Sequence, residues 1–172
     1  MSNPKMFKYE WIWEKPNGTN FISVNYQPFR VHEQILIFGK GAITYTKNPE
    51  KNMKYIPQKS IGNPYTAKTG DSVRRSVHRE GSDMSGHITI NEGTRHPRSV
   101  QRFNSEKGLH PTQKPVTLLE FLIKSYTNEN DLILDNCMGS GSTGVACKNL
   151  NRKFIGIELD EEYFKIAQSR IA

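Results

Sequence analysis

The sequence predicts an α/β fold with a doubly wound, mainly parallel sheet. Helix-like and strand-like patterns alternate through residues 109–172. A turn with the spacing Gly139-x-Gly141-x-x-Gly144 stands between a strand-like run and a helix-like run, the usual place of a ligand-binding turn in such sheets. Further strand-like runs in residues 1–43 would add to the sheet.

Size and composition limit the class of protein. A chain of 172 residues is one domain by length. No run of about 18 apolar residues occurs, so no membrane span is expected. The two cysteines, Cys137 and Cys147, suggest a reducing cytoplasm rather than a disulfide framework. Histidine and cysteine show no metal-ligand spacing, so no metal is expected.

Residues 1–43 are predicted to form strands. In "KYEWIWEK", Tyr9, Trp11 and Trp13 alternate with other residues, which is the period of a strand. Farther on, Ile35–Phe38 is a short apolar run that ends at a glycine. Such a run is typical of a strand buried on both faces.

Residues 44–108 form a segment of different composition that contains nearly all of the excess positive charge. This segment has twelve Lys and Arg against six Asp and Glu, whereas the whole chain has a net charge of +7. Proline, glycine and small polar residues leave no sustained helical or alternating pattern. The charge favours a polyanionic partner on one surface, and the composition equally allows a solvated, flexible insert.

Residues 109–172 predict helix, strand, helix, strand and helix in order. "PVTLLEFLIKSYT" has apolar residues at helical spacing, and Pro115 suits the start of a helix. "DLILD" reads as a buried strand, followed by the glycine turn and a helix through "TGVACKNL". "RKFIGIELD" is a second strand and "EEYFKIAQSRIA" a closing helix. The two strands should be parallel neighbours.

Two acids at strand ends indicate an adenosyl cofactor. Asp135 ends the first of these strands and Glu158 the second, so both lie at the edge of the sheet where ligands bind. Glu158 could accept hydrogen bonds from ribose hydroxyls, which NAD and S-adenosylmethionine share. A carboxylate at Asp135 would repel a pyrophosphate but favour a sulfonium and an ammonium group. S-adenosylmethionine is therefore preferred, with an NAD-dependent oxidoreductase as the alternative.

Three stretches together resemble one family. "HPTQKP" at 110–115, "LDNCMGSGSTG" at 134–144 and "FIGIELDEEYFKIAQSRI" at 154–171 are similar to consecutive motifs of amino DNA methyltransferases of the permuted, beta-type class. "YEWIWEKPN" and "HEQILIFGKG" match that class more loosely. The resemblance implies a Rossmann-like S-adenosylmethionine-dependent methyltransferase sheet, and an enzyme of bacteria and phages that methylates adenine N6 or cytosine N4.

The resemblance also implies a set of cofactor-binding residues. The loop before the first helix would receive the methionine carboxylate, the glycine turn would line the methionine side, and Glu158 would bind the ribose. Asn136 and Cys137 stand where Pro and Phe are usual, which should alter packing near the methyl group. The implied residues are His110, Thr112, Lys114, Pro115, Asp135, Asn136, Cys137, Gly139, Ser140, Gly141 and Glu158.

The basic segment corresponds in position to the family's target-recognition region. The implied partner is double-stranded DNA, with adenine N6 as the expected target amine. Arginines of this segment would contact phosphates, and one or two would read guanine edges. The arginines concerned are Arg74, Arg75, Arg79, Arg95, Arg98 and Arg102.

The family's catalytic motif, (Asp/Asn/Ser)-Pro-Pro-aromatic, does not occur in the sequence; "NPYT" at 63–66 lacks the second proline. In the permuted class this motif precedes the segment with which the chain begins, so Met1 is expected to be an internal position of a longer protein. The resemblance then implies an incomplete sheet without its central strands, inactive alone. A separately encoded N-terminal half is a candidate partner, and a non-catalytic DNA-binding module is a further alternative.

Joint replacement of Arg74 and Arg75 by alanine should weaken DNA binding and flatten its dependence on salt, because fewer counterions would be released from phosphates. Titration of labelled duplex DNA at several salt concentrations measures both effects. An unchanged salt slope would contradict this role for the two arginines.

Overall fold

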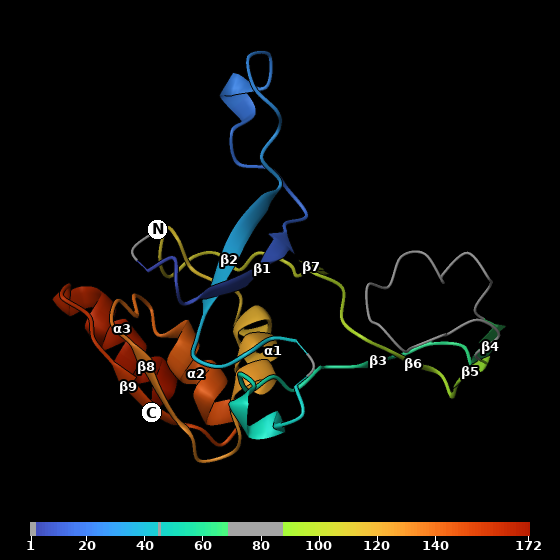
Figure 1. Cartoon of the computed structure of the whole chain (residues 1–172). Helices are drawn as coiled ribbons and strands as arrows, with labels where there is room; N and C mark the ends of the chain where they lie inside the picture. The colour runs from blue at the N-terminus through green and yellow to red at the C-terminus, as the bar shows by residue number, and fades with distance from the viewer. Residues whose placement is uncertain (1–2, 45, 69–87) are drawn as a thin grey trace. The chain divides into compact units, whose positions relative to one another are not determined.

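The computed structural model describes residues 3–44, 46–68 and 88–172. The chain divides into two compact units (Figure 1). One, here called the main unit, comprises Met1–Gln58 and Arg98–Ala172; the other, the insert unit, is Lys59–Pro97 and lies within the basic segment. Each unit is described by itself.

A three-stranded sheet forms the first layer of the main unit. Its central strand, β1 (Phe7–Glu14), pairs antiparallel with β2 (His32–Phe38) and parallel with β7 (Val100–Arg102). The alternation along β1 places Trp11 and Trp13 on one face, where both are buried. The predicted strand in "KYEWIWEK" is therefore confirmed, and the structure adds that one of its faces is buried and aromatic.

Helix α1 (Val116–Tyr126) packs against this aromatic face. The Phe121 ring stands edge-on to the Trp11 ring at a centroid distance of 5.3 Å. Trp11 Nε1 donates to the Tyr126 hydroxyl at 2.6 Å, and that hydroxyl lies 3.0 Å from the Tyr9 hydroxyl. The polar tips of buried aromatic side chains thus find partners, which joins the sheet to the helix.

The opposite side of α1 packs on the second layer. Ile123 forms a core with Ala146 and Cys147 of α2 (Ser142–Asn149). Ile133 of β8 (Leu132–Asp135) and Phe154 of β9 (Lys153–Gly156) pack against that core. β8 and β9 pair in parallel, with Leu134 opposite Ile155. The predicted order of helices and strands after residue 109 is confirmed.

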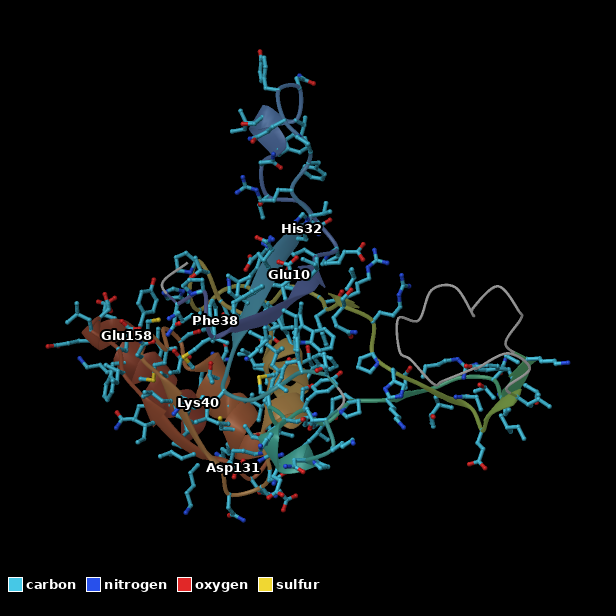
Figure 2. The ribbon with its side chains drawn as sticks, viewed as in Figure 1. Glu10, His32, Phe38, Lys40, Asp131 and Glu158 are labelled. Atoms are coloured by element: carbon cyan, nitrogen blue, oxygen red, sulfur yellow. The ribbon has the colours of Figure 1, made fainter. Side chains whose placement is uncertain are left out.

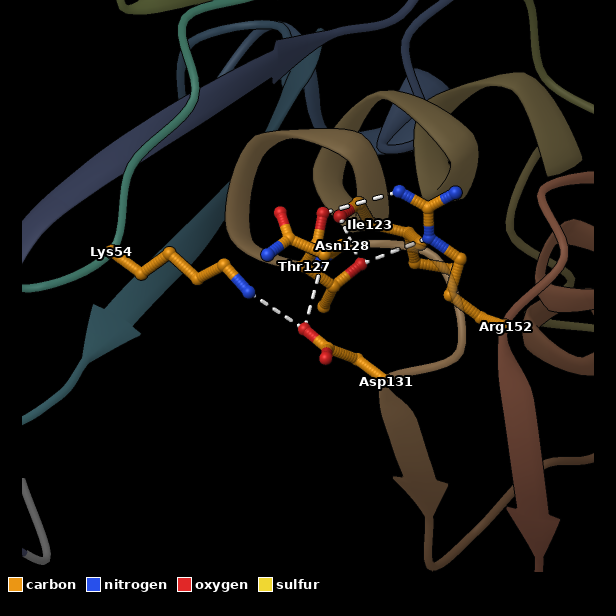
Figure 3. A network of polar contacts seen from close by, with 6 residues as sticks. All are labelled: Lys54, Ile123, Thr127, Asn128, Asp131 and Arg152. Atoms are coloured by element: carbon orange, nitrogen blue, oxygen red, sulfur yellow. Dashed lines mark hydrogen bonds and ion pairs between the residues drawn. The ribbon is translucent and has the colours of Figure 1, made fainter.

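A polar network fastens the carboxyl end of α1 to the second layer (Figure 3). Arg152 donates to the Thr127 hydroxyl and carbonyl at 3.2 and 3.1 Å, and the Thr127 hydroxyl donates to the Ile123 carbonyl at 2.7 Å. Asp131 accepts from Lys54 Nζ at 2.7 Å and from the Asn128 amide at 2.8 Å. The hydrogen bond from Lys54, followed by that from Asn128, lowers the pKa of Asp131.

The closing helix α3 (Glu161–Ile171) covers α2. Asp160 caps its start by accepting from the amides of Glu162 and Tyr163 at 2.9 and 3.0 Å. Gly144 lets the two helices approach, because a Cβ at that position would lie 2.2 Å from Ile171 Cδ1. The helix pair therefore depends on a missing side chain rather than on a large apolar contact.

Two predicted strands are less buried than expected. Ile35–Phe38 was expected to be buried on both faces and "DLILD" to be a buried strand, and this is wrong: exposed and half-buried residues alternate along β2 and β8. Among the described residues, helices cover only one face of each strand. On β8 and β9 the uncovered side, here called the open face, consists of Leu132, Leu134, Ile155 and Ile157, which are 49–61% exposed.

The insert unit contains short antiparallel pairs that the composition did not predict. β3 (Ser60–Ile61) pairs with β6 (Thr94–Arg95), and β4 (Tyr65–Lys68) pairs with β5 (Ile88–Asn91).

Two single-turn 3-10 helices, Phe21–Ser23 and Pro49–Lys51, lie in the main unit. Within the described part of the chain, no helix has the length and apolar character to cross a membrane.

Candidate functional site

A cavity of about 260 Å³ lies where β8 ends, between the glycine turn and the loop before α1. A ligand-binding position at the carboxyl end of a strand is expected in this type of sheet. The structure brings several of the sequence-predicted residues together around the cavity. Those lining it are His110, Thr112, Lys114, Asp135, Cys137, Gly139 and Ser140.

Asp135 organises the turn from the end of β8. Its carboxylate accepts from the Thr143 hydroxyl at 2.6 Å and from the Cys137 amide at 3.1 Å. These bonds connect the strand end to the first turn of α2. Because carboxylate oxygens have further lone pairs, Asp135 can still attract a positive group in the cavity.

Glu158 secures the same turn from β9. Its carboxylate accepts from the Gly139 amide at 2.7 Å and from the Leu159 and Asp160 amides at 2.9 and 3.0 Å. The amide of Asp160, then that of Gly139, lowers the pKa of Glu158. Figure 2 shows Glu158 beside α3, and it does not line the cavity itself. The carboxylate therefore stays ionised at the rim of the turn.

Gly139 allows the loop before α1 to approach the turn closely. Its φ is +52°, and a Cβ there would lie 3.3 Å from His110 Cδ2. The His110 ring stands edge-on to the Tyr163 ring, with 4.3 Å between the ring centroids. His110 Nδ1 accepts from the Thr112 amide at 3.2 Å. The histidine is thus held between α3 and the turn, where it forms one wall of the cavity.

Three other predicted residues lie outside the cavity lining: Pro115, Asn136 and Gly141. Pro115 is buried immediately before α1. Gly141 faces α3, since a Cβ there would lie 2.8 Å from Ala167 Cβ. The absence of a side chain at Gly141 therefore allows the turn to pack closely against α3.

The start of α1 is already occupied by an acid of the chain itself. The Val116 amide donates to Glu106 Oε1 at 2.9 Å, and Gln113 Nε2 donates to the other oxygen of Glu106 at 3.2 Å. One of the backbone amides at the start of α1 is therefore not available to a methionine carboxylate. This contact was not visible in the sequence, because Glu106 stands ten residues before its partner in an irregular segment.

Lys114 joins the loop to the first sheet. Its Nζ lies 2.9 Å from Glu33 Oε2 on β2, and Lys15 pairs with the other oxygen of Glu33. Burial of Glu33 opposes its ionisation, but the hydrogen bonds from Lys15 and Lys114 outweigh that effect and lower its pKa. Lys114 therefore has a structural partner in addition to its place beside the cavity.

A second hollow of about 580 Å³, here called the adjoining hollow, lies on the other side of the same loop. Thr112, Gln113 and Lys114 line both spaces. Trp13 and Glu33 contribute further walls of the adjoining hollow. A molecule in this hollow would therefore lie beside one bound in the cavity at the end of β8.

Some lining residues were missed at the level of sequence. Thr143 is the most informative, because a hydroxyl in the first turn of a helix after a glycine turn is well placed to bond the preceding acid. The others are apolar, amide and serine positions without a distinctive pattern. The missed residues are Gln113, Leu119, Met138, Ser142 and Thr143.

The described arginines of the basic segment have different surroundings. Arg74, Arg75 and Arg79 lie outside the described residues. In the insert unit, Arg95 donates to Asn91 Oδ1 at 2.6 Å and to the Asn63 carbonyl, and it lies over the Tyr65 ring at 4.7 Å. Its guanidinium thus holds the insert unit together.

The two remaining arginines, Arg98 and Arg102, belong to the main unit and are exposed. Arg102 ends β7, beside Glu14 of β1. The described residues contain no cluster of His, Cys, Asp or Glu suited to a metal ion.

A parallel strand pair with acids at its ends and a glycine turn between them defines a ligand-binding protein of the doubly wound α/β class. The family model described as DNA methylase, N6_N4_Mtase, matches residues 2–169, and the chain belongs to this family. Its members are S-adenosylmethionine-dependent DNA methyltransferases. Membership decides against the oxidoreductase alternative.

Relatives of known type agree with this assignment. The chain is 30% identical to Type II methyltransferase M.HpaI of Haemophilus parainfluenzae, over 96% of this chain and 58% of the relative. It is 32% identical to M2.MboI of Moraxella bovis, over 95% of this chain and 64% of the relative. A shorter match, 58% identical over 69 residues, is to M2.LlaDCHI of Lactococcus lactis subsp. cremoris, covering 39% of this chain and 26% of that relative.

Solved structures show the same fold. A complex of M1.HpyAVI with SAM matches with a TM-score of 0.57 and 29% identity, over 96% of this chain and 62% of that one. The cytosine-N4-specific PvuII DNA methyltransferase matches with a TM-score of 0.58 at 18% identity, over 96% and 52%. The chain therefore spans less than two thirds of these proteins, and the Rossmann-like methyltransferase fold it forms is incomplete.

Replacement of Glu33 by Gln should remove a stabilising contribution that depends on pH. A carboxylate with a lowered pKa stabilises the folded state above its unfolded pKa, here about 4.5, and this stabilisation is lost as pH falls through the folded value. E33Q should therefore be less stable than the parent near neutrality, by about 1 kcal/mol or less because Glu33 is partly exposed.

Urea unfolding between pH 7 and pH 3 measures the difference, which should narrow in the acidic range. The matched control is E129Q, a change at an exposed carboxylate after α1. A difference between E33Q and the parent that stays constant across this range would contradict the ion-pair role.

Proposed function

We propose that the chain provides the S-adenosylmethionine-binding and DNA-contacting parts of a DNA N-methyltransferase. The reaction would transfer a methyl group from the cofactor to an exocyclic amine of a flipped base, with adenine N6 as the target. The observation that supports this most directly is the pair of acids, Asp135 and Glu158, that hold the glycine turn of a chain in the DNA methylase family. DNA as substrate implies a cytoplasmic location.

The residues around the turn fit such a cofactor. When bound, S-adenosylmethionine supplies a methyl group activated by the neighbouring sulfonium. Asp135 borders the cavity and would favour a cationic group there. Glu158 Oε2 receives one amide hydrogen and has capacity for a second bond, which suits a ribose hydroxyl. Gly139 leaves the wall beside His110 free of a side chain.

Activation of the amine needs groups that these residues do not include. The lone pair of an exocyclic amine is delocalised into the base, so hydrogen-bond acceptors and a stacking aromatic must assist its attack. The sequence lacks the (Asp/Asn/Ser)-Pro-Pro-aromatic motif that would supply them. We therefore propose that this motif comes from a further polypeptide segment.

The uncovered parts of the second layer support that segment's place. Leu134 and Ile155 of the open face are 61% and 49% exposed, which is unfavourable for apolar side chains in water. Within the described residues β8 pairs only with β9, so one edge of β8 is unpaired. A segment that adds a strand to β8 and covers the open face would bring its motif to the strand ends, next to the cofactor cavity.

DNA contacts are proposed for the basic side chains. Arg98 and Arg102 are exposed on the main unit, and Arg74, Arg75 and Arg79 lie in the part of the basic segment outside the described residues. The engagement of Arg95 within the insert unit makes it a positioning residue for that unit rather than a phosphate contact.

The target base is identified by digesting to nucleosides the DNA that the complete enzyme has methylated. This digestion separates N6-methyladenine from N4-methylcytosine.

The cofactor should protect Cys137 from alkylation. Cys137 is exposed and lines the cavity, whereas burial raises the pKa of Cys147 to about 11 and keeps that thiol unreactive. Cofactor at ten times its Kd should slow labelling of Cys137 by iodoacetamide about tenfold by mass action. Peptide mass spectrometry follows both cysteines.

NAD at the same concentration should give no protection. E158Q should raise the S-adenosylmethionine concentration needed to protect Cys137 about tenfold, because a charge-assisted hydrogen bond is lost. E162Q on α3 serves as the matched control. Equal labelling of Cys137 with and without S-adenosylmethionine would overturn the proposed cofactor site.

The 172-residue chain by itself should transfer no methyl group above background. Its sequence lacks the (Asp/Asn/Ser)-Pro-Pro-aromatic motif that would accept the hydrogens of the target amine. Incubation with tritiated S-adenosylmethionine and bacterial genomic DNA tests this. Incorporation that disappears in E158Q would show that these residues suffice for catalysis and would overturn the need for a further segment.

A further inference from the structure

The loop between β1 and β2, residues 15–31, presents large apolar side chains to solvent. Phe21, Ile22 and Tyr26, here called the apolar tip, are 77%, 94% and 91% exposed. The loop projects beyond the ends of the two strands (Figure 1). Side chains of this size are costly to leave in water, so their grouping at one tip indicates a binding surface.

The loop is an ordered platform. Asn20 Nδ2 donates to the Pro28 carbonyl at 3.0 Å, and Asn20 Oδ1 accepts from the Arg30 amide at 2.6 Å. The Phe29 ring lies against Gly18, where a Cβ would come within 2.4 Å of it. The apolar tip is thus held apart from the base of the loop and cannot fold down onto it without breaking these contacts.

The base of the loop stands at the proposed reaction site. Residues 15–19 line the adjoining hollow together with Trp13 and Lys114. That hollow shares the wall of Thr112, Gln113 and Lys114 with the cofactor cavity. The base of the loop, from which the apolar tip projects, therefore lies beside the proposed cofactor site.

The charge of the loop indicates what that partner is. Residues 15–31 contain neither Asp nor Glu, and of their two basic residues Lys15 is paired with Glu33, which leaves Arg30 as the positive charge of the loop. Arg30 is exposed and lies two residues before His32, the first residue of β2. A surface that combines aromatic and aliphatic side chains with positive charge suits the stacked bases and phosphates of a nucleic acid.

We propose that the apolar tip inserts between base pairs of the DNA substrate and occupies the space that the flipped target base leaves. This inference rests on the proposed function and adds the residues that hold the DNA open. Arg30 would contact a phosphate beside the opening. Unstacking a base step is costly, and apolar contacts with Phe21, Ile22 and Tyr26 would offset that cost.

The test compares two duplexes of the same sequence, one intact and one with a single abasic site. An abasic site already contains the gap, so the full chain should bind it on the order of tenfold more tightly. The variant F21A/I22A/Y26A should bind both duplexes equally, with its salt dependence unchanged. I22A alone, at a position 94% exposed, should reduce the preference without affecting folding.

The matched control is L132A/I155A, which removes exposed apolar side chains from the open face and should keep the preference. DNA binding by the parent chain without any abasic preference overturns the inference and leaves the proposed function standing. A preference that survives in F21A/I22A/Y26A overturns it as well. Absence of any DNA binding overturns the proposed function itself. A dimer in sedimentation velocity without DNA, abolished in that variant, would assign the tip to a second copy of the chain instead.

Discussion

Helix α1 is buried on two sides at once, and the other contacts of the main unit depend on this. One side meets the aromatic face of β1 through Phe121 and Tyr126, and the other meets α2 and β8 through Ile123. The two small sheets have no strand pairing with each other among the described residues. Their relative position is therefore set by side chains of one eleven-residue helix.

This arrangement places the candidate site at the start of α1. The loop before the helix forms one wall of the cavity, and the glycine turn after β8 forms the other. Two carboxylates hold the turn by accepting backbone amides, Asp135 from Cys137 and Glu158 from Gly139. Because both partners of each bond belong to the chain itself, the turn is held in one conformation, and such preorganisation favours affinity.

Apolar side chains are exposed at several places, and two of these, the open face and the apolar tip, call for different partners. The open face is part of a regular strand pair with an unpaired edge, which suits another strand and its helix. The apolar tip lies on an irregular loop that has no strand edge and carries the exposed Arg30, which suits DNA. The geometry of the backbone, rather than the amount of exposed area, separates the two cases.

The sequence by itself determined the helices and strands after residue 109, the strand β1 and the family, because all of these depend on local period, turn residues and short motifs. Tertiary structure alone decided the partner of Lys114 on β2, the use of Glu106 at the start of α1 and the inward engagement of Arg95. It also decided that β2 and β8 are covered on one face only. Charge pairing and burial depend on segments distant in the chain, and an apolar run looks the same in sequence whether one or both of its faces are covered.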